Sequence, residues 1–134
     1  MVESLKLTIT VPAKPKEVYK AWMSSAEHTE FTGEQAKIDP KVGGKFTAFG
    51  DYISGENLEL KPGKLIAQSW RTTEYPDGHE DSRLEILFEE VKGGTKVTLV
   101  QTNIPRSQGT KYKSGWKEFY LQPLKRYFAE RQKE

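Results

Sequence analysis

The sequence lacks cysteine altogether and has only two histidines, His28 and His79. Without cysteine the chain forms no disulfide, presents no thiolate nucleophile and binds no zinc through sulfur. The acidic turn that holds Asp77, His79, Glu80 and Asp81 shows no metal-ligand spacing, and we expect it to be a solvated hairpin tip. The sequence therefore predicts no metal site and no cofactor.

Long apolar runs and a strong charge of one sign are also missing. No stretch approaches the roughly 20 apolar residues of a membrane-spanning helix, and the start of the chain lacks the basic-then-apolar pattern of a secretory signal. The 21 Lys and Arg residues nearly balance 19 Asp and Glu residues and are scattered along the chain. We therefore expect a cytoplasmic protein that binds neither membrane nor nucleic acid. The length of 134 residues fits one domain spanning residues 1–134.

Most of the chain alternates apolar and polar residues with a period of two, which is typical of strands with one buried face. The first strand is predicted over residues 5–11. Two short helices follow it, one beginning at Pro15 and the other ending at Phe31. Turns that contain Gly or Pro separate further predicted strands at residues 35–38, 45–49, 52–60, 64–73, 82–89 and around 97–99.

The last quarter of the chain is predicted to be one helix from about residue 107 to Arg131. Its aromatic side chains recur at three- and four-residue intervals and so share one helical face. Pro123 interrupts this face and should distort the helix. The order of elements predicts an α+β helix-grip fold, in which a curved antiparallel sheet of six or seven strands wraps around a long C-terminal helix, with two short helices after the first strand.

Short motifs spread over nearly the whole chain, among them Gly43-Gly44-Lys45-Phe46, residues 59–71 and residues 115–120, carry a resemblance. The chain resembles the activator of heat-shock protein 90 ATPase homologue family, within the START-like superfamily, as a stand-alone member. The resemblance implies a cavity between the sheet and the last helix, which in other relatives binds hydrophobic small molecules. It also implies heat-shock protein 90 as a candidate partner. In the eukaryotic co-chaperone this unit follows an N-terminal domain that stimulates the chaperone's ATPase, and the sequence shows no counterpart of that domain.

Two polar residues are predicted on apolar strand faces. Glu56 shares the parity of the apolar residues in its strand, so its carboxylate should point to the concave face unless a bulge near Gly55 reverses the register. Gln68 also falls on the apolar side of its strand. Pairing inside the protein or a polar cavity wall would satisfy each of them. The candidate ligand-binding residues are, on the cavity wall, Glu56, Gln68, Trp70, Tyr112, Trp116, Tyr120 and Tyr127, and on a lid, His28 and Phe31.

Three functions are open from the sequence. The first is a non-enzymatic binding protein whose hydrophobic cavity takes a small apolar or amphipathic molecule. The second is a partner of heat-shock protein 90 that works through its outer surface. The third is a cavity enzyme that uses Glu56 or His28 as a general base.

Overall fold

The computed structural model describes residues 2–131, and within them seven strands form one antiparallel sheet. In sheet order these strands are β1 (Glu3–Val11), β7 (Gly94–Ile104), β6 (Ser82–Val91), β5 (Leu65–Thr72), β4 (Ile53–Lys61), β3 (Lys45–Ala48) and β2 (Lys37–Ile38). Two short helices follow β1, namely α1 (Pro15–Met23) and α2 (Ser25–Thr32). The C-terminal helix comprises α3 (Gly109–Trp116), a π-helical segment η1 (Lys117–Leu121) and α4 (Gln122–Arg131). The predicted helix-grip fold is confirmed.

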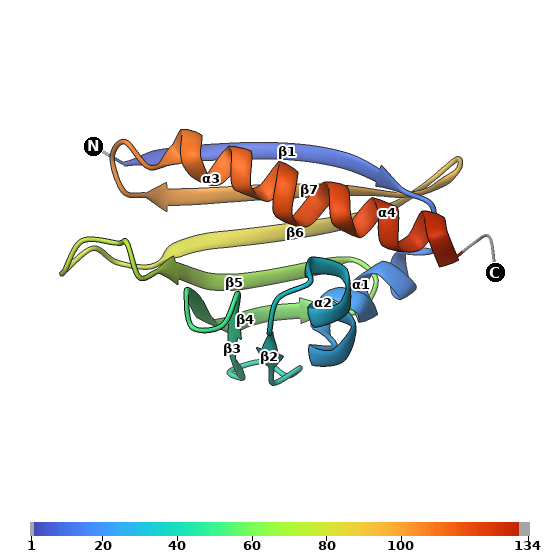
Figure 1. Ribbon diagram of the computed structural model, residues 1–134, viewed down its shortest axis with the longest axis horizontal. Helices are drawn as coiled ribbons and strands as arrows, with labels where there is room; N and C mark the ends of the chain where they lie inside the picture. Colours follow the sequence, from blue (N-terminus) through green and yellow to red (C-terminus); the bar gives the residue numbers. More distant parts are fainter. Residues whose placement is uncertain (1, 132–134) are drawn as a thin grey trace.

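The C-terminal helix lies across one face of the sheet, and α1 and α2 sit at the end of the sheet near α4 (Figure 1). Buried and more exposed residues alternate along the strands, as predicted. In β6 the even-numbered residues from Ser82 to Phe88 are buried, and in β7 the odd-numbered residues from Thr95 to Gln101 are buried. The side chains that fill the space between sheet and helix include Ile66, Leu84, Ile86, Leu99 and Leu124. None of the described helices is long and apolar enough to span a membrane.

The π-helical segment η1 accommodates Pro123 in the C-terminal helix. Proline has no N–H, so the carbonyl of Phe119 would lose its partner in a regular α-helix. In the turn just before this proline the chain widens, and the Gln122 N–H donates to the carbonyl of Lys117, five residues back. The extra residue in that turn lets two consecutive side chains, Tyr120 and Leu121, both be buried. The predicted distortion of the helix is therefore a π turn.

The start of the C-terminal helix is tied to the first strand. The carboxylate of Glu3 accepts hydrogen bonds from the backbone N–H groups of Ser107, at 2.9 Å, and Gly109, at 2.8 Å. These bonds lower the pKa of the Glu3 carboxyl, with the Ser107 bond as the larger cause. An acidic group at a helix N-terminus pairs with N–H groups that have no partner within the helix. The contact fixes where the helix begins above the sheet.

Two local expectations differ from the structure. The strand expected over residues 35–38 is reduced to the two residues of β2, and the last strand is longer than expected, from Gly94 to Ile104. The turn after β5 is only partly a solvated tip, because half of it docks on the end of β7. His79 Nε2 lies 2.9 Å from the Asn103 carbonyl, and Asp81 accepts a hydrogen bond from Arg71 at 2.8 Å.

Candidate functional site

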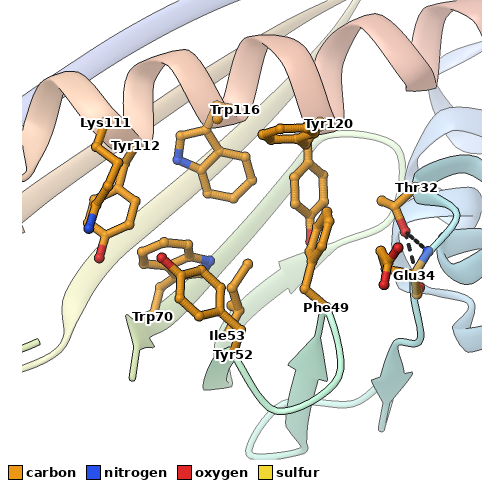
Figure 2. A pocket seen from close by; sticks show the side chains of 12 residues that line it. Thr32, Glu34, Phe49, Tyr52, Ile53, Trp70, Lys111, Tyr112, Trp116 and Tyr120 are labelled. Carbon is orange, nitrogen blue, oxygen red and sulfur yellow. Dashed lines mark hydrogen bonds between the residues drawn. The ribbon is translucent and has the colours of Figure 1, made fainter. Parts of the chain in front are cut away.

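A pocket of about 420 Å³ lies beneath the first half of the C-terminal helix, between that helix and the strands β4 and β5. Figure 2 shows Tyr112, Trp116 and Tyr120 projecting from the helix toward Trp70 on the sheet. The other lining residues come from the end of α2 and the segment after it, the turn between β3 and β4, the start of β4, and the helix itself: Thr32, Glu34, Phe49, Tyr52, Ile53, Lys111, Gly115 and Phe119.

The innermost wall of the pocket is built from indole and phenol rings in mutual contact. The ring centroids of Trp70 and Trp116 lie 5.4 Å apart, and those of Trp116 and Tyr120 lie 4.7 Å apart. The indole N–H of Trp116 donates to Gln101 Oε1 at 2.7 Å, which fixes the plane of the ring. Gln101 is fully buried on β7. Its role in orienting the wall was not predicted, because the last strand was expected only around residues 97–99 and Gln101 lies beyond that range.

Gln68 is satisfied within the protein. Its side-chain N–H donates to Asn57 Oδ1 at 2.9 Å, and Asn57 in turn donates to the backbone carbonyls of Asp39, at 2.8 Å, and Lys41, at 3.0 Å. Both side chains are buried and neither lines the pocket. Of the two outcomes left open by the sequence, internal pairing is the one found for Gln68.

Glu56 takes the second of the two orientations left open by the sequence, the one that a bulge produces, although the bulge lies at Leu58 and not near Gly55. Residues Asn57 and Glu59 pair with the consecutive residues Gln68 and Ala67, so Leu58 is an extra residue in β4. This bulge reverses the parity of everything before it. Asn57 therefore takes the inward position, and Glu56 falls on the opposite face, half-buried and away from the pocket lining.

His28 lies behind the pocket wall, in contact with Tyr120. Its Nδ1 is 2.8 Å from the Trp22 carbonyl, which can only accept, so Nδ1 carries the hydrogen. Its Nε2 therefore accepts the hydrogen bond from the Tyr120 hydroxyl at 2.9 Å. Burial lowers the pKa of His28 to about 4, and it raises the pKa of the Tyr120 hydroxyl far above its ordinary value. The imidazole is neutral near pH 7, and both its nitrogens are occupied.

Phe31 and Tyr127 also lie outside the pocket. Their ring centroids are 6.2 Å apart, where α2 packs against α4. The Tyr127 hydroxyl donates to the carboxylate of Glu30 at 3.1 Å. The structure thus brings four of the nine predicted site residues into the pocket, namely Trp70, Tyr112, Trp116 and Tyr120. The helix α2 closes one side of the core behind them.

One end of the pocket carries a fully paired set of polar groups that the sequence did not reveal. Lys111 Nζ lies 2.7 Å from Glu74 Oε1, and the Tyr52 hydroxyl donates to the other oxygen of the same carboxylate. The hydrogen bond from Lys111 is the largest cause that lowers the pKa of Glu74. Nearby, the hydroxyls of Tyr112 and Thr72 are 2.6 Å apart. The positive charge at this end is therefore already balanced by a protein carboxylate.

The opposite end is lined by Glu34, Phe49 and Phe119, and we call it the mouth because Glu34 and Phe119 are exposed there. The ring of Phe119 is 57% exposed, and its centroid lies 6.5 Å from that of Phe49. The backbone of Phe49 has a φ of +53°, a left-handed conformation that residues other than glycine rarely adopt. Among the described residues, the Glu34 carboxylate has neither a hydrogen bond nor an ion pair.

The fold and its aromatic pocket define a protein of the START-like helix-grip class. Residues 12–129 match the family described as "Activator of Hsp90 ATPase homolog 1-like protein". The chain belongs to this family, as its motifs predicted.

Individual relatives agree with this assignment. The chain is 33% identical over 128 residues to the activator of 90 kDa heat shock protein ATPase homolog of Dictyostelium discoideum, covering 95% of this chain and 33% of that protein. It is 27% identical to the human homolog 1, covering 96% of this chain and 38% of that protein. The chain thus spans little more than a third of the length of these curated relatives.

A solved structure of similar size also matches. The crystal structure of an HSP90 activator from Plasmodium falciparum superposes with a TM-score of 0.82 at 28% identity. The match covers 90% of this chain and 92% of that one.

Proposed function

We propose that this protein is a non-enzymatic binding protein that takes a small apolar or amphipathic molecule into the pocket beneath its C-terminal helix. The observation that carries the proposal is the pocket itself, with about 420 Å³ of space and seven aromatic residues among the twelve that line it. Small-molecule sites in proteins are typically concave, mostly apolar and equipped with a few oriented polar groups.

The placement of the candidate bases favours binding over catalysis. Glu56 lies on the far face of the sheet, and His28 has both ring nitrogens engaged by Trp22 and Tyr120. A general base needs a free lone pair within hydrogen-bond reach of the substrate. Neither Glu56 nor His28 offers a free lone pair inside the pocket, so neither candidate base can act there as a general base.

Gly115 provides the sharpest test of the pocket. A Cβ atom built at this position meets only Phe119 Cδ2, at 4.0 Å, and otherwise points into open space. We expect a Gly115→Leu variant to fold and to lose ligand binding because its side chain occupies the pocket. Asp77→Ala, on the exposed turn after β5, should leave binding unchanged.

The measurement is ligand-dependent thermal stabilisation together with quenching of Trp70 and Trp116 fluorescence. A ligand at 100 times its Kd that binds only the folded state adds about 2.7 kcal/mol. Compounds that stabilise the unmodified protein and Gly115→Leu equally would refute the proposed location, because such binding does not use the pocket.

A second candidate function is partnership with heat-shock protein 90. The observation that favours it is the description of the relatives, including the similarly sized Plasmodium protein, as activators of this chaperone. We expect the chain to bind the chaperone without stimulating its ATPase as strongly as the full-length relatives, because it spans only about a third of their length. Strong stoichiometric activation by the purified chain would place this function first.

Both proposals assume that residues 1–134 form one domain and that the protein is cytoplasmic, and both of these points remain predictions from the sequence.

A further inference from the structure

The pocket has two ends of unlike charge, and only one of them is free. At the end away from the mouth, the cation of the exposed Lys111 is held by Glu74, whose carboxylate is also bound by Tyr52. At the mouth the Glu34 carboxylate has no partner among the described residues. The three charged groups therefore leave one uncompensated negative charge at the pocket, and it lies at the mouth.

The position of Glu34 is set by the backbone on both sides of it. Gly33 ends α2 in a left-handed conformation with a φ of +81°, and the Glu34 N–H then donates to the Thr32 hydroxyl at 3.2 Å. One residue further on, the Gln35 carbonyl accepts the N–H of Gly50 at 3.0 Å. That bond joins the segment after α2 to the turn that carries Phe49. Glu34 and Phe49 are thus held at the same rim by hydrogen bonds, although they are far apart in the sequence.

The rim beside Glu34 is aromatic. The ring centroid of Phe49 lies 5.5 Å from that of Tyr120 and 6.5 Å from that of Phe119, at steep angles in both cases. Phe119 is more than half exposed, although it lies on the pocket side of the helix. Aromatic faces attract cations through the ring quadrupole, and a carboxylate next to them adds a charge of the required sign.

We propose that the pocket selects organic cations: molecules with an aromatic or apolar body that lies along Trp70 and Trp116, and an ammonium group at the mouth between Glu34 and the rings of Phe49 and Phe119. The inference rests on the proposed binding function and names its ligand class. An anionic head group finds no free cation here, since Lys111 is already paired with Glu74.

The test uses three probes with one ring system: 1-naphthylmethylamine as the cation, 1-naphthalenemethanol as the neutral form and 1-naphthoate as the anion. Isothermal titration calorimetry gives Kd for each at low salt. We expect the amine to bind about fivefold tighter than the alcohol, from the usual size of exposed cation–π and surface charge contacts. The anion should bind more weakly than the alcohol. High salt should reduce the difference, since exposed charges are screened.

Two substitutions at the rim assign the effect. Glu34 is exposed and its side chain has no partner among the described residues, so Glu34→Gln should fold normally and abolish the preference for the amine over the alcohol. Glu34→Lys should reverse the preference toward naphthoate. Asp77→Asn removes a remote exposed carboxylate and should preserve the order of the unmodified protein.

The outcomes distinguish a failure of the cation preference from a failure of the proposed binding function. If the three probes bind with equal affinity, or if the preference survives in Glu34→Gln, cation selection is refuted and the binding function stands. Tighter binding of naphthoate in the unmodified protein also refutes the inference. If no probe binds, or if Gly115→Leu binds all three unchanged, the pocket is not the binding site and both proposals fail.

Discussion

The aromatic side chains of the C-terminal helix meet two different surroundings, one filled and one open. Toward α1 and α2, Tyr120 stacks on Trp22 at 5.1 Å between ring centroids, bonds to His28 and is buried. Toward the turn between β3 and β4, Phe119 faces Phe49 across a wide angle and is mostly exposed. Helical spacing identifies a row of aromatic residues in both cases. Whether the row is core or cavity wall depends on what the facing segment supplies.

Trp116 belongs to both regions and should give the largest effect. It contacts Trp22 on the filled side and Trp70 on the open side, with ring centroids at 6.2 and 5.4 Å. Trp116→Ala should reduce the free energy of unfolding by about 3–5 kcal/mol in urea titration, as large-to-small core changes do. Phe119→Ala should cost under about 1 kcal/mol because that ring is exposed. Equal losses for the two variants would erase the distinction between the filled and open sides.

The filled side should also make stability depend on pH. His28 has a pKa of about 4 in the folded protein, because burial disfavours its charged form, against about 6.5 in an unfolded chain. Between these values the unfolded state binds more protons, so stability falls as the pH falls from about 6.5 to 4. The loss should amount to roughly 3 kcal/mol. His28→Gln should flatten this part of the profile, whereas an unchanged slope in that variant would show that other groups cause it.

The hydroxyl of Tyr120 is the next contribution to the filled side. Tyr120→Phe keeps the ring but leaves His28 Nε2 as a buried acceptor without a donor. Such a loss typically costs about 1–3 kcal/mol. Tyr127→Phe is the matched control, because the Tyr127 hydroxyl bonds to an exposed carboxylate, and it should cost less than about 0.5 kcal/mol. Chemical denaturation of both variants decides the matter, and a smaller loss for Tyr120→Phe than for Tyr127→Phe would contradict the assignment.

The aromatic row of the C-terminal helix could be predicted from the sequence better than the mouth of the pocket. The spacing of Tyr112, Trp116 and Tyr120 follows the period of a helix, and that period depends only on neighbours in the chain. The mouth depends on a hydrogen bond between Gln35 and Gly50, which joins two loops and leaves no local signal.

The sequence left the orientation of Glu56 open for a related reason, since one extra residue at Leu58 reverses the parity along its strand. Single-residue bulges change which face a side chain occupies without changing the apolar pattern on either side of them. Residues whose neighbours are set by such irregularities, Asn57 among them, are found only when the strand pairing is known.

The smallest expected effect tests whether the open side is truly unfilled. Gly115 lies within α3 and lines the pocket, and a Cβ there meets nothing closer than 4.0 Å. Gly115→Ala should therefore raise the free energy of unfolding by about 0.5–1 kcal/mol, since alanine lowers the entropy lost in forming a helix. In the hydrophobic core, Ala21 is completely buried in α1, and Ala21→Leu should cost about 1–3 kcal/mol through overpacking. Gly115→Leu should show no such cost, because its side chain enters empty space.

Thermal and urea unfolding of the three variants provide the comparison. A loss of stability in Gly115→Leu as large as that in Ala21→Leu would mean that the helix packs as closely on the open side as on the filled one.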